Sequence, residues 1–195
     1  MKKHVFLFLL IVMAVSSITA QDKSQIDLQN QFKINYNIVA FEGIYELPIA
    51  KEFVLDLGLG FGAGNYIKKD AFLNKSFGTS LSFKSFPSLR FKSSIKYIYN
   101  RIKRAQNNKN NKNNAGNYLE FQTLYTTKQK NASNISNSAD NTLLTEMRWG
   151  MQRSLGGNWL FNVHFGIGYG KDFETKIDNF YPALGLSFSY IIFKK

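Results

Sequence analysis

The chain has 195 residues, 44% of them hydrophobic and only 19% charged, and a formal net charge of +12. Eighteen Phe, ten Tyr and fourteen Gly against three Pro are typical of β-structure and argue against a helical or disordered chain. The absence of Cys excludes a disulfide framework and any Cys-based metal site.

Residues 1–20 have the pattern of a secretory signal peptide. Lysines at the N-terminus precede an apolar run from Val5 to Val15, and small and polar residues then lead to Ala20. The alternative is a membrane anchor, but about eleven apolar residues are too few to cross a hydrocarbon core roughly 30 Å thick. We therefore expect cleavage after Ala20 and a single mature domain at 21–195.

After the signal peptide, several segments carry apolar residues at every second position. A period of two predicts strands with two unlike faces, and no stretch is apolar enough for a membrane-spanning helix. In chain order we predict a strand somewhere within Ile26–Ile34, and then strands at Val39–Leu47, Phe53–Ala63, Leu89–Tyr99, Leu119–Tyr125, Leu143–Met151, Trp159–Tyr169 and Leu184–Ile192. The first has the weakest alternation.

The connectors differ in length in a regular way. Short turns at Pro48–Lys51 and Leu155–Asn158 fall at one end, whereas long loops at 64–86, 129–140 and 171–180 fall at the other. This asymmetry is typical of outer-membrane barrels.

One connector, Lys103–Gly116, is long although its position assigns it to the end with the short turns. Its Asn-rich stretch at 106–114 is of low complexity, and we expect it to be flexible. Either this connector is an unusually long turn or the strand count is wrong by one.

The composition of the two strand faces distinguishes a membrane barrel from a soluble one. One face carries large apolar and aromatic residues, while the other carries Gly, Ser and charged residues that fit the narrow interior of an eight-stranded barrel. A soluble barrel would turn its apolar face inward. Aromatic residues at predicted strand ends are typical of the two membrane interfaces; they are Tyr45, Tyr97, Tyr99, Trp159, Tyr169 and Tyr190.

The last strand resembles the assembly signal of outer-membrane barrels, in which a glycine, here Gly185, is followed by the aromatic residues Phe188 and Tyr190. Four further segments resemble small outer-membrane β-barrel proteins of the Bacteroidetes type, which are OmpX-like or OmpA-like; they are Arg90–Arg104, Ala115–Leu119, Trp149–Arg153 and Phe165–Gly170. The resemblance implies an all-β, eight-stranded antiparallel up-and-down transmembrane barrel in the bacterial cell outer membrane, and it implies no established activity.

The basic charge of an exported chain favours anionic partners, namely lipopolysaccharide, outer-membrane phospholipid or cell-wall polymers, and the resemblance adds the barrel assembly machinery. We expect a monomer that meets no nucleic acid, because the chain is exported despite its basic charge. Basic residues in the connectors can bind anionic polymers or can simply be solvated.

The inward face predicts a network of nearly balanced charges, because a buried charge is tolerated only when it is paired and hydrogen-bonded. Its members are Glu42, Glu46, Asp56, Arg90, Lys92, Lys96, Glu120, Glu146, Arg148 and His164. The network could form a plug that fixes the strand register, or it could line an ion or solute path. We favour the plug, since an eight-stranded lumen is normally filled.

The sequence does not predict an enzyme. His164 is the one histidine of the mature part, and no nucleophile with an oriented base stands beside it in the sequence. Gly58, Gly60 and Gly62 lie inside a strand pattern that no helix follows, which argues against a phosphate-binding loop. We expect no catalytic, metal or cofactor site.

These observations favour a structural or interaction protein, a filled barrel that displays the loops 64–86, 129–140 and 171–180. The alternative is a small-solute channel or a lipid-active enzyme built on the same barrel.

Overall fold

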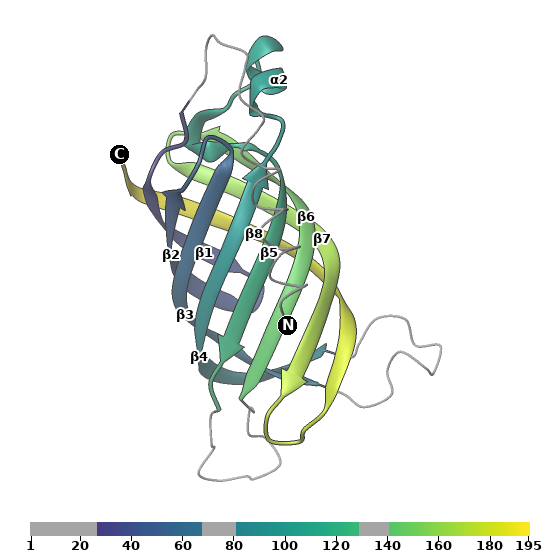
Figure 1. Ribbon diagram of the computed structural model, residues 1–195. Helices are drawn as coiled ribbons and strands as arrows, with labels where there is room; N and C mark the ends of the chain where they lie inside the picture. The colour runs from purple at the N-terminus through teal and green to yellow at the C-terminus, as the bar shows by residue number, and fades with distance from the viewer. Residues whose placement is uncertain (1–26, 68–80, 129–140) are drawn as a thin grey trace.

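The computed structural model describes residues 27–67, 81–128 and 141–195, and within them eight antiparallel strands close into an up-and-down barrel (Figure 1). The strands are β1 Gln31–Asn37, β2 Ala40–Pro48, β3 Phe53–Ile67, β4 Leu81–Ile98, β5 Gly116–Thr126, β6 Thr142–Gly156, β7 Trp159–Asp172 and β8 Asp178–Lys194. The connector between β4 and β5 holds the helix α2, Arg101–Gln106, and the 3₁₀ turn η1, Lys112–Asn114. The predicted signal peptide and the loop 129–140 lie outside the described residues. None of the described helices is long and apolar enough to cross a membrane.

All eight predicted strands are present, but some of their ends were wrong. The first, expected somewhere within Ile26–Ile34, runs from Gln31 to Asn37 and so ends later than expected. The loop predicted at 64–86 is shorter, because β3 continues to Ile67 and β4 already begins at Leu81. The loop predicted at 171–180 shrinks to the residues between Asp172 and Asp178.

The strand faces point in the directions that the alternation predicts, with the apolar face outward and the polar face inward. Leu59 is 54% exposed on the outside of the barrel, whereas Asp56 and Lys96 are 3% and 2% exposed on its inside. The barrel is therefore apolar on its outer surface and charged within.

Inward glycines create the space that the interior side chains occupy. In the register, Glu42 of β2 lies opposite Gly60 of β3, which in turn lies opposite Arg90 of β4. Because Gly60 has no side chain, Glu42 and Arg90 meet across it and form an ion pair. A Cβ at Gly60 would collide with the backbone of Phe41 and with Glu42, so this glycine is required by close packing.

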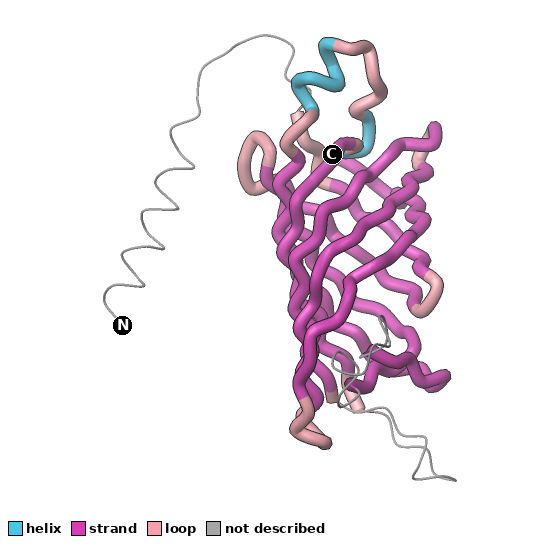
Figure 2. The backbone as a smooth tube through the Cα atoms, turned by 90° about the vertical axis from the view of Figure 1, so that its right-hand side faces the viewer, coloured by secondary structure: helices cyan, strands magenta, loops and turns pink. Residues whose placement is uncertain are grey.

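The wall of the barrel is uneven in height. β1 and β2 have 7 and 9 residues, whereas β4 and β8 have 18 and 17. The β1–β2 turn therefore lies part-way along the barrel, on the right in Figure 2, while neighbouring strands continue further.

Candidate functional site

The barrel interior holds the charged residues predicted for the lumen, in three neighbouring groups. The first is centred on Lys96, whose Nζ lies 2.9 Å from Asp56 Oδ2 and 3.4 Å from Glu46 Oε1. Lys33 forms a second ion pair with Glu46. Each of these four side chains is at most 5% exposed. In a buried group of this kind, the charged side chains are stabilised by pairing with one another.

The second group shares one carboxylate between two cations. Arg90 Nε lies 3.3 Å from Glu42 Oε1, and Lys92 Nζ lies 3.4 Å from Glu42 Oε2. Asn35 Nδ2 also donates a hydrogen bond to Glu42, at 3.3 Å. The Lys92 side chain is 14% exposed, more than the other lysines of the interior.

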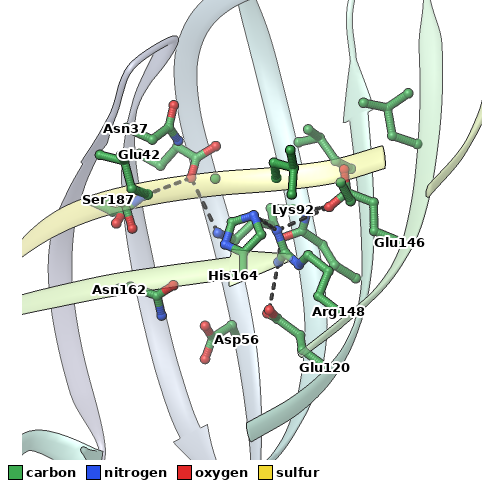
Figure 3. A pocket seen from close by; sticks show the side chains of 18 of the residues that line it. Asn37, Glu42, Asp56, Lys92, Glu120, Glu146, Arg148, Asn162, His164 and Ser187 are labelled. Carbon is green, nitrogen blue, oxygen red and sulfur yellow. Dashed lines mark hydrogen bonds and ion pairs between the residues drawn. The ribbon is translucent and has the colours of Figure 1, made fainter. Parts of the chain in front are cut away.

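Arg148 is the centre of the third group (Figure 3). Its Nη2 lies 2.7 Å from Glu120 Oε2 and its Nη1 lies 3.1 Å from Glu146 Oε2. The Nη1 atom also lies 3.1 Å from His164 Nε2. The hydroxyl of Tyr181 donates a hydrogen bond to Glu146 at 2.7 Å, across the position of Gly168.

All ten residues predicted for the lumen thus lie in one of these three groups. The ion pairs join five cations to five carboxylates in the described interior. The cations are Lys33, Arg90, Lys92, Lys96 and Arg148, and the carboxylates are Glu42, Glu46, Asp56, Glu120 and Glu146. This balance allows the interior to be filled with charged groups without leaving one of them unpaired.

Sequence reasoning missed Lys33, Tyr118 and Tyr181. Lys33 was missed because no faces were assigned to the first strand, although Gln31, Lys33 and Asn35 alternate once β1 begins at Gln31. The two tyrosines were missed because the predicted strands began at Leu119 and Leu184, after Tyr118 and Tyr181. Both face inward, and the Tyr118 hydroxyl donates a 2.8 Å hydrogen bond to Asn162 Oδ1.

The Asn-rich connector was predicted to be flexible, and that prediction was wrong. Residues 101–115 fold into a compact cap over one end of the barrel, beside the C-terminus (Figure 1). Asn108, Asn113 and Asn114 have φ angles of 54°, 59° and 55°, in the left-handed region. Asparagine tolerates this region better than most residues, so an Asn-rich sequence can encode a tightly turning loop.

Buried asparagine side chains attach the cap to both ends of the chain. Asn114 Nδ2 donates to Gln29 O at 2.8 Å, and Asn114 Oδ1 accepts from Gln29 N at 2.9 Å. Asn113 Oδ1 accepts a 2.9 Å hydrogen bond from Lys194 Nζ. Beside them, burial lowers the pKa of Arg101, while the Glu46 carboxylate acts in the opposite direction.

Replacing Asn114 by Ala should loosen the cap, because it removes both hydrogen bonds to Gln29 and a further one to Glu46 at 3.2 Å. Removing these hydrogen bonds, one of which satisfies the fully buried Glu46 carboxylate, should cost about 1 to 3 kcal/mol and expose the connector to proteases. Limited proteolysis of the folded protein measures this effect. Asn107→Ala is the matched control, since it removes one exposed hydrogen bond; equal cleavage of both variants would contradict the role given to Asn114.

The opposite end of the lumen is closed by an apolar cluster. Its buried members are Ile67, Leu124, Leu144, Tyr181 and Ala183, with Ile177 packed against them. The turn that carries Ile177 is held to the ends of β5 and β6, because Lys128 Nζ lies 2.6 Å from Glu174 Oε2 and Asn141 donates to Glu174 Oε1 at 3.1 Å. We call this end of the barrel the loop end.

A cavity of about 640 Å³ lies between the cap and the apolar cluster. It is lined by members of all three charged groups, and also by residues of the β1–β2 turn and of the middle of β8. In the described part of the chain, no group of three His, Cys, Asp or Glu side chains is arranged to hold a metal ion.

The residues of the predicted assembly signal lie on β8 with alternating directions. Phe188 and Tyr190 are 42% and 40% exposed on the outer face, where their rings contact Phe161 and Trp159. Gly185 faces inward against the ring of His164, and a Cβ at this position would lie 2.6 Å from the imidazole Nε2.

Comparison with protein-family models, curated proteins and solved structures gives no match. The resemblance to small outer-membrane barrels stays a prediction, and the function is argued from the geometry. His164 Nε2 lies 3.1 Å from Arg148 Nη1, and its ring lies against the position of Gly185.

Proposed function

We propose that the chain is an integral outer-membrane barrel whose lumen is filled except for the cavity described above, and whose role is structural or is to bind a partner through its loops. The observation that carries this proposal is the outer surface. Large apolar side chains cover it from β1 around to β8 and are between 37% and 73% exposed. A soluble barrel with its charges inside and its apolar residues outside would expose a very large hydrophobic surface to water.

Aromatic side chains at both ends of the strands support a membrane position. Near the cap, Tyr97 stacks on Phe53 at a 5.0 Å centroid distance, and Trp159 packs edge-on against Tyr190 at 5.0 Å. Near the loop end, Tyr169 packs on Phe180 at 5.2 Å. Such girdles are expected where amphipathic rings meet the two interfaces of a bilayer.

The two closed ends favour a filled barrel over a channel. Ions moving along the barrel axis would have to displace both the cap and the apolar cluster, and between them the charges are engaged with one another. We therefore expect no steady conductance in planar bilayers. Open-channel currents from the purified protein would support the solute-channel alternative instead.

Heat-modifiable gel migration of outer-membrane fractions tests the architecture and the location together. A closed membrane barrel should run at a different apparent mass before and after boiling, because the strand network resists detergent until it is heated. A single unchanged band, or recovery of the protein in the soluble fraction, would contradict the proposal.

Tyr190→Ala should leave more of the chain unassembled in the periplasm, because Tyr190 is one of the aromatic residues of the predicted assembly signal and packs on Trp159. Tyr169→Ala is the control, since it also removes an outward tyrosine that packs on an aromatic ring but lies on β7. The ratio of heat-modifiable to unfolded protein measures assembly. Equal loss in the two variants would remove the special role of the last strand.

A further inference from the structure

The uneven wall leaves an opening in the side of the barrel near the loop end. β1 pairs with β8 from Lys194 to Ser187, where β1 ends at Asn37, but β8 itself begins at Asp178. In the described chain, residues 181–186 of β8 pair with β7 on one side, and the β1–β2 turn stops short of them on the other. The β2–β3 ladder likewise ends at Ala40 and Gly62, while β3 continues to Ile67.

The lumen cavity reaches this opening. Its lining includes Ile38 and Val39 of the β1–β2 turn and Leu184 of β8, which lie in the wall, together with the interior residues Arg90 and Lys92. Ile38 and Leu184 are each 73% exposed, the highest values among the large apolar side chains of the described residues. The cavity is thus charged at its inner end, and its mouth is lined by Ile38, Val39 and Leu184 beside the polar residues Asn37 and Ser187.

The second group has two cations for one carboxylate, the reverse of the third group, in which Arg148 pairs with both Glu120 and Glu146. Arg90 and Lys92 share the single carboxylate of Glu42. Arg90 also reaches toward the opening, because its Nη1 donates to Ala63 O at 3.3 Å and Ala63 N donates to Val39 O at 2.8 Å. A second anion beside these cations would be favourably placed, since hydrogen bonds to charged groups are among the stronger ones in proteins.

We propose that this side opening binds one amphipathic anion, with its phosphate or carboxylate head beside Arg90 and Lys92 and its hydrocarbon chain against Ile38 and Leu184. The closed ends make the side of the barrel the natural route to the cavity. The inference rests on the proposed membrane position only for the source of the ligand, because lipids would contact the opening within the bilayer. The site itself can be tested in detergent.

The experiment uses the folded protein in micelles of a nonionic detergent, titrated with dodecyl phosphate and, separately, with inorganic phosphate, and followed by phosphorus NMR. We expect dodecyl phosphate to bind saturably at one molecule per barrel and inorganic phosphate to bind at least about tenfold more weakly, because it lacks the chain. Absence of saturable binding, or equal affinity for the two ligands, overturns the proposal.

Two variants locate the site. Lys92→Met should weaken dodecyl phosphate binding by about tenfold or more, whereas Lys51→Met, at an exposed turn near the cap, should not. Ile38→Asp places a carboxylate at the mouth and should weaken binding, whereas Ile49→Asp, at an exposed position near the cap, should not. Because Ile38 is exposed, this variant remains informative if Lys92→Met does not fold. Unchanged affinity in Ile38→Asp places the ligand elsewhere and refutes the proposal.

The result can be told apart from a failure of the proposed function. Heat-modifiable migration in membrane fractions tests the membrane barrel, and binding in micelles tests the side opening. A barrel that is heat-modifiable but does not bind dodecyl phosphate would refute this inference alone.

Discussion

Replacing Lys96 by Met should lower the free energy of unfolding by about 3 to 5 kcal/mol, the usual cost of removing one partner from a buried ion pair. Lys96 is 2% exposed and pairs with both Asp56 and Glu46. Asp56 Oδ1 already has no hydrogen-bond partner among the described residues, so the loss of Lys96 would leave that carboxylate buried and uncompensated. Urea titration of the protein folded in lipid vesicles measures the change.

Lys92→Met is the matched control, because it removes a lysine from the same strand and the same lumen. Glu42 would keep its ion pair with Arg90 and its hydrogen bond from Asn35, and Lys92 is the more exposed lysine. We therefore expect a clearly smaller loss of stability than for Lys96→Met. If both variants lost the same stability, the interior charges would stabilise the barrel collectively. The separate groups that the ion pairs define would then have no distinct energetic role.

Replacing Leu59 by Arg should destabilise the inserted barrel by about 2 to 4 kcal/mol, the cost of an arginine on the lipid-facing side near the bilayer midplane. Leu59 is 54% exposed on the outer face and lies midway along β3. The measurement is again urea titration in vesicles.

Leu59→Phe is the control for this variant, since it changes the size of the side chain but keeps the surface apolar. It should fold with nearly unchanged stability. If Leu59→Arg were equally stable, the outer face would be in contact with water, and the membrane proposal would be wrong.

The resemblance to outer-membrane barrels implied the antiparallel order, and alternation predicted seven of the eight strands and the direction of most of their side chains. The reason is that a strand with one apolar and one charged face admits a single assignment of its two sides. Glu42, Asp56 and Lys96 were assigned to the interior from this pattern, and they lie there. Which cation pairs with which carboxylate was not predictable, because pairing depends on the register between strands.

The cap and the side opening could not be predicted from the sequence pattern. Asparagine repeats are common in flexible segments, and their left-handed φ angles become visible only when the loop is folded. The side opening depends on where β1 ends relative to β8, and the ends of strands are set by partner strands and not by local alternation. The end of β1 at Asn37 was not predicted for the same reason.

The cap joins the middle of the chain to both of its ends. Asn114 and Gln29 are 85 positions apart, and Asn113 and Lys194 are 81 positions apart. Such contacts form only after the entropy cost of closing long loops has been met, and they slow folding. The contact with Gln29 requires the segment before β1 to be in place, and the contact with Lys194 requires the end of β8 to be in place. Protection of the Gln29 backbone amide, which donates to Asn114 Oδ1, from hydrogen exchange should therefore appear late in folding.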